Sequence, residues 1–246
     1  MSKKINLLQK NKSILNLIIS GMILFSFQLK INAETLAQEK QGEIYEKLNT
    51  KLDLSLKFKD QSGNTVFFSD LLKNEKVLIL TLNYYKCTTM CALQFVNLAD
   101  SLKKLGWKIG DGFRIATVSF DPKDTVEVAA EKHKVWVPKT GQESAKWDFL
   151  VADEDTIKKL TKQLNFYYEY ETRTGEYSHA AALFFIKKDG TFYRYLYGIV
   201  YEPKEIKQAI IETSSGELGS FIEKIMTKFS KYKEQNGKYV SILNNQ

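Results

Sequence analysis

Residues 77–105 read VLILTLNYYKCTTMCALQFVNLADSLKKL, and this stretch decides the fold. Residues 77–82 form a continuous apolar run of strand length, which is typical of a central strand covered on both faces. From Cys91 to Leu105, apolar residues recur at alternating spacings of four and three, and Gly106 then predicts a helix end. The stretch therefore predicts a buried strand that leads directly into an amphipathic helix, with two cysteines at the junction.

The rest of the chain alternates between strand and helix patterns. Asp124 with Glu127 three residues later predicts a capping box for a helix that reaches about Lys134. The other expected elements are strands over 113–120, 149–152, 181–186 and 191–197 and helices over 153–164 and 203–215, with a hairpin turn at 187–190. Strands alternating with helices, closed by a hairpin and a helix, predict a single α/β domain with a mixed sheet.

Both ends of this domain carry additions. Residues 52–56 alternate strictly and residues 65–68 follow a turn signal, so an N-terminal hairpin is expected. Polar residues 34–50 are expected to form a linker. An amphipathic segment over 221–229 predicts a C-terminal helical extension within residues 217–246.

Composition excludes some classes of protein. With 43% hydrophobic and 13% aromatic residues, the 246-residue chain can bury a sizeable core, which excludes a disordered chain. The net charge of +7 comes mainly from five lysines in the first 33 residues, which contain no acid; the remainder carries 31 basic and 29 acidic side chains. No basic region remains to favour nucleic-acid binding.

The N-terminus has the pattern of an export signal. Four lysines precede the nearly uncharged residues 13–29, and Ile31-Asn32-Ala33 resembles a cleavage site, so residues 1–33 are expected to be a secretory signal peptide. An uncleaved membrane anchor is the alternative, because this nearly uncharged stretch of 17 residues approaches the length that spans a bilayer. Either interpretation exports the domain to the periplasm or cell envelope, where thiols meet oxidising conditions.

The two cysteines are the main candidates for chemistry. Cys87 and Cys91 are four residues apart, which on a helix places them on one face with Cα atoms about 6 Å apart, near the wide end of the range for a disulfide. The N-terminus of a helix is expected to stabilise thiolates, which bind soft metal ions. A structural disulfide or a pair of buried core thiols is the alternative, but a disulfide that closes so short a loop stabilises little.

Each histidine has a different setting. His133 lies among charged residues near a helix end and is expected to be solvated, whereas His179 stands just before the apolar strand at 181–186. If His179 reaches the cysteines, two thiolates and an imidazole favour copper, while zinc would require a fourth ligand. Met90 is a further soft side chain between the cysteines.

These features together resemble the SCO/SenC family of copper-delivery proteins. The resemblance rests on the strand, Tyr-x-x-Cys-x-x-x-Cys, the helix, the segment TVSFDP at 117–122, and Ser178-His179 before a strand, and it covers about residues 51–216. It implies a thioredoxin-like mixed sheet flanked by helices, with Cys87, Cys91 and His179 as copper ligands. The family's acidic residue after the second strand corresponds to Asp121, and the prolines that commonly follow each cysteine are replaced here by Thr88 and Ala92.

The resemblance also implies a partner. Family members assist the copper centre of cytochrome c oxidase subunit II, by inserting copper or by keeping its thiols reduced with the help of a thiol reductant in the envelope. A metallochaperone is therefore the first hypothesis, and a thiol–disulfide oxidoreductase that uses Cys87 and Cys91 is the second.

Tyr193, Tyr195 and Tyr197 share one face of a strand, which indicates either sheet packing or a docking surface.

Overall fold

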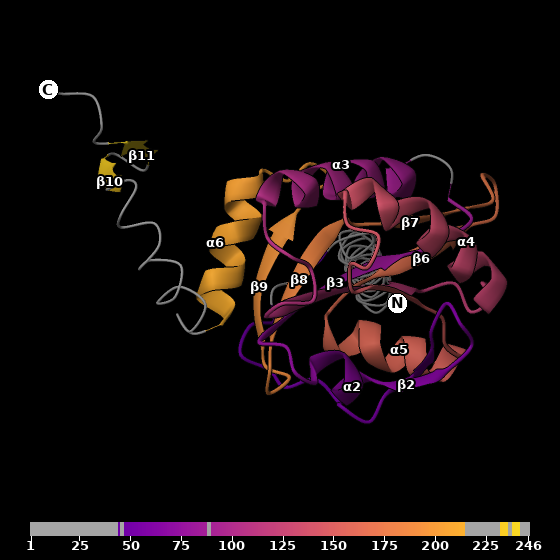
Figure 1. Ribbon diagram of the computed structural model, residues 1–246. Helices are drawn as coiled ribbons and strands as arrows, with labels where there is room; N and C mark the ends of the chain where they lie inside the picture. Colours follow the sequence, from indigo (N-terminus) through magenta and orange to yellow (C-terminus); the bar gives the residue numbers. More distant parts are fainter. Residues whose placement is uncertain (1–43, 45–46, 88–89, 215–231, 236–237, 242–246) are drawn as a thin grey trace, which may run out of the picture. The chain divides into compact units, whose positions relative to one another are not determined.

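The computed structural model describes residues 44, 47–87, 90–214, 232–235 and 238–241 (Figure 1). The chain divides into two compact units. The described part of the first is Tyr167–His179, called here the hairpin unit. The second, called here the main unit, comprises the described residues of Ile44–Phe166 and Ala180–Gln246.

The main unit is built on a five-stranded sheet in the order β5-β4-β3-β8-β9. β3 lies in the centre, parallel to β4 and antiparallel to β8, while β4 pairs with β5 in parallel and β8 with β9 in antiparallel orientation. Every residue of β3 is buried, as predicted from its apolar run. The predicted mixed α/β sheet is thus confirmed, with strands β3 Val77–Asn83, β4 Phe113–Ser119, β5 Trp147–Leu150, β8 Ala182–Lys187 and β9 Phe192–Tyr197.

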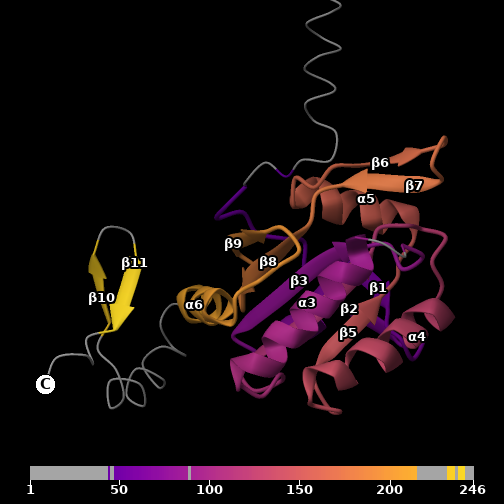
Figure 2. The ribbon, with the colours of Figure 1, turned by 90° about the horizontal axis from the view of Figure 1, so that it is seen from above.

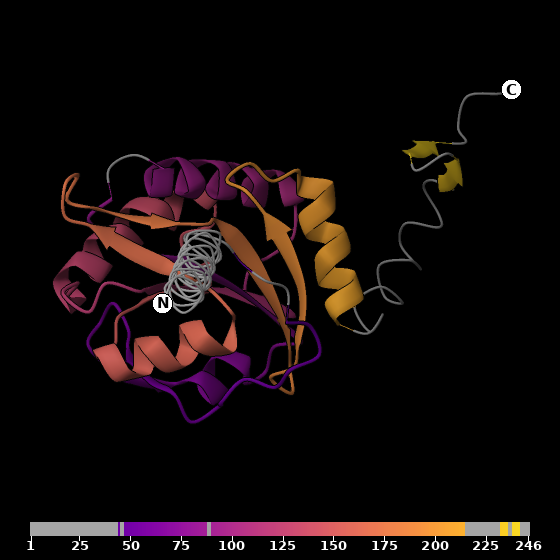
Figure 3. The ribbon, with the colours of Figure 1, turned by 180° about the vertical axis from the view of Figure 1, so that it is seen from behind.

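Helices cover both faces of this sheet (Figures 1 and 3). Helices α3 Met90–Leu105 and α4 Val126–Trp136 lie over one face, and α6 Pro203–Thr213 joins the same apolar cluster beside β8 and β9 (Figure 2). Helices α2 Phe68–Leu72 and α5 Glu154–Gln163 cover the other face. Because successive side chains along each strand point to opposite faces, the sheet contributes side chains to two apolar layers, one on each face.

The expected N-terminal hairpin forms, but its first strand was misplaced. β1 Lys57–Lys59 pairs with β2 Thr65–Phe67, so the strand prediction for residues 52–56 is wrong. There, the Asp53 carboxylate accepts hydrogen bonds from Ser55 N at 2.9 Å and Ser55 Oγ at 2.6 Å, which stabilises a turn. Leu52 and Leu56, on either side of Asp53 and Ser55, are buried. Their even spacing in the sequence is also the spacing expected on one face of a strand.

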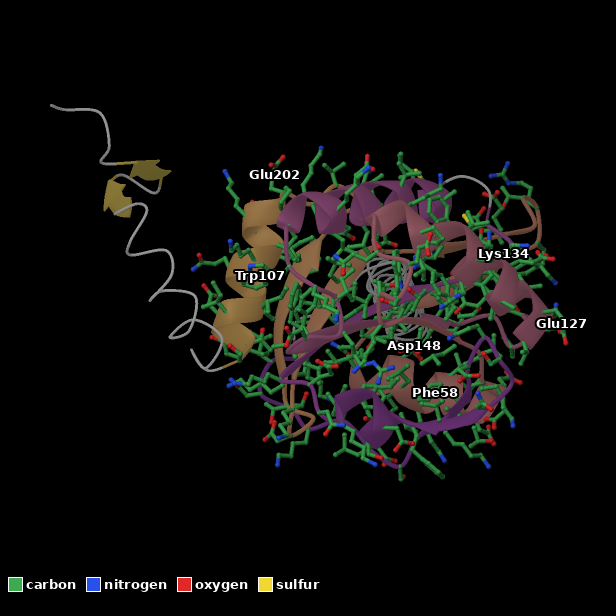
Figure 4. The ribbon with its side chains drawn as sticks, viewed as in Figure 1. Phe58, Trp107, Glu127, Lys134, Asp148 and Glu202 are labelled. Carbon is green, nitrogen blue, oxygen red and sulfur yellow. The ribbon has the colours of Figure 1, made fainter. Side chains whose placement is uncertain are left out.

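The predicted capping box at Asp124 and Glu127 is also wrong. Helix α4 begins at Val126, with Thr125 at the N-cap position. The Asp124 side chain is instead buried beneath the strand ends, where it bonds to other groups. Glu127 lies at the outer start of α4 (Figure 4), and a hydrogen bond with the Thr125 side chain lowers the pKa of Glu127.

Two packing contacts show how the layers are closed around the sheet. On the face covered by α2 and α5, Phe58 is fully buried with its ring centroid 6.3 Å from that of Phe68 (Figure 4). Beside α6, Lys207 Nζ lies 4.9 Å from the ring centroid of Trp107, a cation–π contact (Figure 4). The first contact joins β1 to the start of α2, and the second joins α6 to the segment that follows α3.

The hairpin unit was not predicted. Its strands β6 Tyr168–Glu171 and β7 Glu176–His179 pair antiparallel, with Tyr168 opposite His179 and Tyr170 opposite Tyr177. Tyrosine and glutamate alternate through β6, and this period of two was the available signal. His179, which was expected to stand just before a strand, is therefore itself the last residue of β7.

Several N- and C-terminal predictions concern other parts of the chain. The expected helical segment at 221–229 and the expected export signal lie outside the described residues. Within the described part of the C-terminal extension, β10 Tyr232–Gln235 pairs with β11 Lys238–Ser241, a hairpin that sequence analysis did not anticipate. Among the helices of the described residues, none combines the length and apolarity needed to cross a bilayer.

Candidate metal and thiol site

The two cysteines flank the turn between the central strand and the first long helix. β3 ends at Asn83, and Cys91 is the second residue of α3. The Cys87 backbone N–H donates to Tyr84 O at 3.3 Å, which curls the chain back after the strand. Cys87 and Cys91 are 6% and 2% exposed, so both sulfurs lie just beneath the surface at the carboxyl edge of the sheet.

Cys87 and Cys91 are thiols whose side chains hydrogen-bond to each other. Burial raises the pKa of Cys91 far above its usual value, and the hydrogen bond and charge of Cys87 raise it further. A hydrogen bond with the Tyr84 backbone and the nearby charge of Lys132 act in the opposite direction. The expected stabilisation of a thiolate by the helix N-terminus stays a prediction, and for Cys91 burial acts against it.

Tyr85 fixes the turn before the cysteines. Its hydroxyl lies 2.9 Å from Thr117 O and 2.8 Å from Leu150 O, so it donates toward the backbones of β4 and β5. Its ring packs against Phe149, with the centroids 6.0 Å apart. Tyr85 is fully buried, so the segment that follows the central strand is held against the core.

Two aspartates follow β4, and only one is shown bonding to the cysteine turn. Asp121 Oδ1 accepts from Lys123 N at 3.0 Å, a hydrogen bond typical of an aspartate that begins a turn. Asp124 Oδ2 accepts from Tyr85 N at 2.6 Å and from Ser119 Oγ at 2.6 Å. Burial raises the pKa of Asp124 although these two hydrogen bonds oppose the shift. Sequence analysis missed this role because the spacing of Asp124 imitates a helix cap.

The histidines occupy the two different units. His179 is the last residue of β7 in the hairpin unit, while both cysteines belong to the main unit. The described geometry thus brings the two thiols together, and the placement of His179 beside them stays a prediction. His133 was expected to be solvated, but it is half-buried in the last turn of α4 with its ring 6.2 Å from that of Phe149, and burial lowers its pKa.

The remaining candidates are Met90 and the row of tyrosines on β9, and they differ in exposure. Met90 is 56% exposed at the start of α3. Tyr195 is buried and its hydroxyl accepts from Lys47 N at 3.0 Å, so packing explains this member of the tyrosine row, while Tyr197 stacks on it from an exposed position. Within the described ranges, no three His, Cys, Asp or Glu side chains gather into a set that could hold a metal ion.

Solved structures share this fold over most of the described chain. A protein of Aquifex aeolicus VF5 is 24% identical with a TM-score of 0.60, and the match covers 70% of this chain and 96% of that one. Copper-bound ScoI of Arabidopsis thaliana is 18% identical with a TM-score of 0.53, covering 68% and 98%. BsSco, described as a cytochrome c oxidase assembly protein with a disulfide switch, is 21% identical with a TM-score of 0.56, covering 70% and 98%.

Sequence comparison identifies the family. No curated protein is significantly similar to the chain. The SCO1/SenC family model, however, matches residues 46–214, which span the sheet, its helices and both cysteines. With the thioredoxin-like fold and the dithiol turn in place, this chain belongs to the SCO1/SenC family.

Proposed function

We propose that this protein binds copper and delivers it during assembly of cytochrome c oxidase, with Cys87, Cys91 and His179 as the ligands. The observation that carries the proposal is the pair of hydrogen-bonded thiols at the edge of the sheet. Membership of the SCO1/SenC family and the copper-bound ScoI structures of similar fold support it. The recipient proposed from the family resemblance is the copper site of cytochrome c oxidase subunit II.

Copper uptake would proceed by exchange of protons for metal. Two thiolates and a neutral imidazole suit Cu(I), a soft ion that accepts low coordination numbers. Each thiol must lose its proton before it can bind, and the pKa of Cys91 is raised by burial. Copper affinity should therefore increase with pH throughout the neutral range, and release to a partner would proceed by stepwise ligand exchange.

The test is competitive titration of the reduced protein with Cu(I) and a chromophoric chelator. We expect one Cu(I) per chain, loss of tight binding in Cys87→Ser and Cys91→Ser, and affinity lower by about tenfold or more in His179→Ala. The matched control is His133→Ala, which removes the other imidazole and should leave the affinity unchanged. If His179→Ala binds copper as tightly as the unmodified protein, His179 is not a ligand.

Thiol–disulfide exchange is the second candidate function, favoured by the hydrogen bond between the two cysteines. The Cys87 thiolate would attack a partner disulfide, forming a mixed disulfide and releasing one partner thiolate. Cys91 would then lose its proton and displace the second partner sulfur, so Cys87 and Cys91 are oxidised to a disulfide and the partner is reduced to a dithiol. A thiol reductant of the envelope would restore the starting state.

Variants distinguish this reaction from copper delivery. Exchange activity that persists in His179→Ala and disappears in Cys87→Ser would favour the oxidoreductase. Exchange too slow to detect in the unmodified protein, together with tight Cu(I) binding, would favour delivery.

We also propose that the domain is exported to the cell envelope and that residues 34–50 connect it to the N-terminal signal or anchor. The lysine-rich start and the apolar residues 13–29 support this proposal. The test is mass spectrometry of the protein isolated from cell fractions. An N-terminus near Glu34 in the soluble envelope fraction would indicate cleavage, an intact N-terminus in membranes would indicate an anchor, and an intact chain in the cytoplasm would contradict export.

A further inference from the structure

We propose that Asp124 is a positioning residue that holds the backbone turn on which Cys87 and Cys91 both depend. The inference rests on the proposed function insofar as the two thiols are the working groups of the protein. It differs from the role of Asp121, whose carboxylate bonds within its own turn.

The Asp124 carboxylate connects the ends of two neighbouring strands. Its Oδ2 atom accepts from Ser119 Oγ at 2.6 Å, and Ser119 is the last residue of β4. The same oxygen accepts from the backbone N–H of Tyr85 at 2.6 Å, just beyond the end of β3. Asp124 is 6% exposed, so water does not compete freely for these hydrogen bonds.

A single peptide group transmits this constraint to Cys87. Tyr84 O and Tyr85 N belong to the same planar peptide bond. Tyr84 O accepts from Cys87 N at 3.3 Å, while Tyr85 N donates to Asp124. If this peptide plane rotated, both hydrogen bonds would be lost together, so Asp124 fixes the orientation of the carbonyl that holds Cys87.

Cys91 is connected to the same turn. The Tyr84 backbone hydrogen-bonds with the Cys91 thiol, and the side chains of Cys91 and Cys87 hydrogen-bond to each other. Release of the turn should therefore free both sulfurs from their common arrangement. Because Cys91 is only 2% exposed, reagents reach it only when this region opens locally.

The geometry requires a hydrogen-bond acceptor at one oxygen position, not a full carboxylate. Oδ2 accepts both hydrogen bonds, and among the described residues the buried Oδ1 atom has no hydrogen-bond partner. An asparagine amide can place its oxygen at the Oδ2 position and keep both bonds. A positioning role therefore predicts rescue by Asp124→Asn, whereas a role that depends on the negative charge predicts none.

The experiment measures alkylation of Cys91 by iodoacetamide in the reduced, copper-free, full-length protein, at one pH, by peptide mass spectrometry. We expect Asp124→Ala to accelerate alkylation by about tenfold or more, because a strong hydrogen bond no longer opposes local opening. Asp124→Asn should stay within about twofold of the unmodified protein, and Ser119→Ala should accelerate alkylation by about threefold. The matched control is Asp153→Ala, which removes the aspartate that caps α5 and should leave Cys91 alkylation unchanged.

Specific results would overturn the proposal. Alkylation of Asp124→Ala at the unmodified rate excludes positioning by Asp124, and equal acceleration in Asp124→Asn shows that charge is the operative property. If Asp124→Ala fails to fold, Asp124→Asn and Ser119→Ala decide, and an unaltered rate in Ser119→Ala counts against the proposal. Because the assay contains no copper, failure of Cu(I) binding in the unmodified protein would remove the proposed function while leaving this result interpretable.

Discussion

Three buried residues of the main unit favour their protonated forms. Burial raises the pKa of Cys91, of Tyr85 and of Tyr201 well above the values usual for thiols and phenols. An unfolded chain would ionise these groups near pH 9 to 10, whereas the folded chain retains the protons. Since the folded state then binds more protons, the free energy of unfolding should fall as pH rises above about 9.

Tyr201→Phe tests this behaviour. The substitution removes one of the three raised pKa values, so the loss of stability between about pH 9 and pH 11 should be smaller by up to about 1.4 kcal/mol per pH unit. It also removes the hydrogen bond that the hydroxyl accepts from Gln94 Nε2 at 2.6 Å, so stability near pH 8 should fall. Urea denaturation at several pH values provides the measurement, and an unchanged slope would contradict the assignment of burial as the cause.

At the scale of elements, Asp153 and Asp124 both precede a helix, but only Asp153 caps it. Asp153 is the N-cap of α5 and accepts from Thr156 N at 2.8 Å. Asp124 stands two residues before α4, but its carboxylate turns away toward Tyr85 and Ser119. The helix start of α4 therefore has no side-chain cap at Thr125. The buried donors Tyr85 N and Ser119 Oγ thus take the Asp124 carboxylate that would otherwise be available to α4.

Alanine substitutions at the two cap positions should separate these cases. Asp153→Ala should lower the free energy of unfolding by about 1 kcal/mol, because it leaves a first-turn N–H group of α5 without its acceptor. Thr125→Ala should cost less than about half of that, since Thr125 makes no cap hydrogen bond. Urea midpoints compare the two variants, and equal losses would show that the cap contact in α5 adds no stability.

At the scale of the whole main unit, an aromatic cluster connects the thiol turn to the core. Phe95 of α3 packs against Trp136 of α4 and against Trp147 and Phe149 of β5, at centroid distances of 5.4, 6.2 and 5.7 Å. Phe149 in turn contacts Tyr85, the anchor of the cysteine turn. The position of the thiols is thus determined by the same packing that joins the sheet to its helices.

Phe95→Ala should therefore be among the most destabilising single substitutions. Removal of a fully buried aromatic ring leaves a cavity and is expected to cost about 3–5 kcal/mol. The neighbouring Val96 is 40% exposed on the same helix, and Val96→Ala should cost less than about 1 kcal/mol. Thermal or urea unfolding measures both, and a loss below about 1 kcal/mol in Phe95→Ala would show that this cluster is not a principal source of stability.

Whether an element could be predicted depended on what produced its sequence pattern. The runs that became β3 and α3 were predicted because their periodicity reports burial on two faces or on one. The strand prediction at residues 52–56 failed because a side-chain turn at Asp53 produces the same spacing of buried leucines. The β6–β7 hairpin was not predicted, because most of its side chains are exposed and its alternation therefore does not report burial.

The amino-acid sequence by itself determined the order of strands and helices, the location of the cysteine pair at a strand-to-helix junction, and the resemblance to one family. These features depend on residues close together along the chain. Tertiary structure alone decided that Asp124 bonds to the cysteine turn and that Cys91 holds its proton more strongly than an exposed thiol. Both outcomes depend on desolvation and hydrogen bonds contributed by residues from other strands and helices, which no local pattern records.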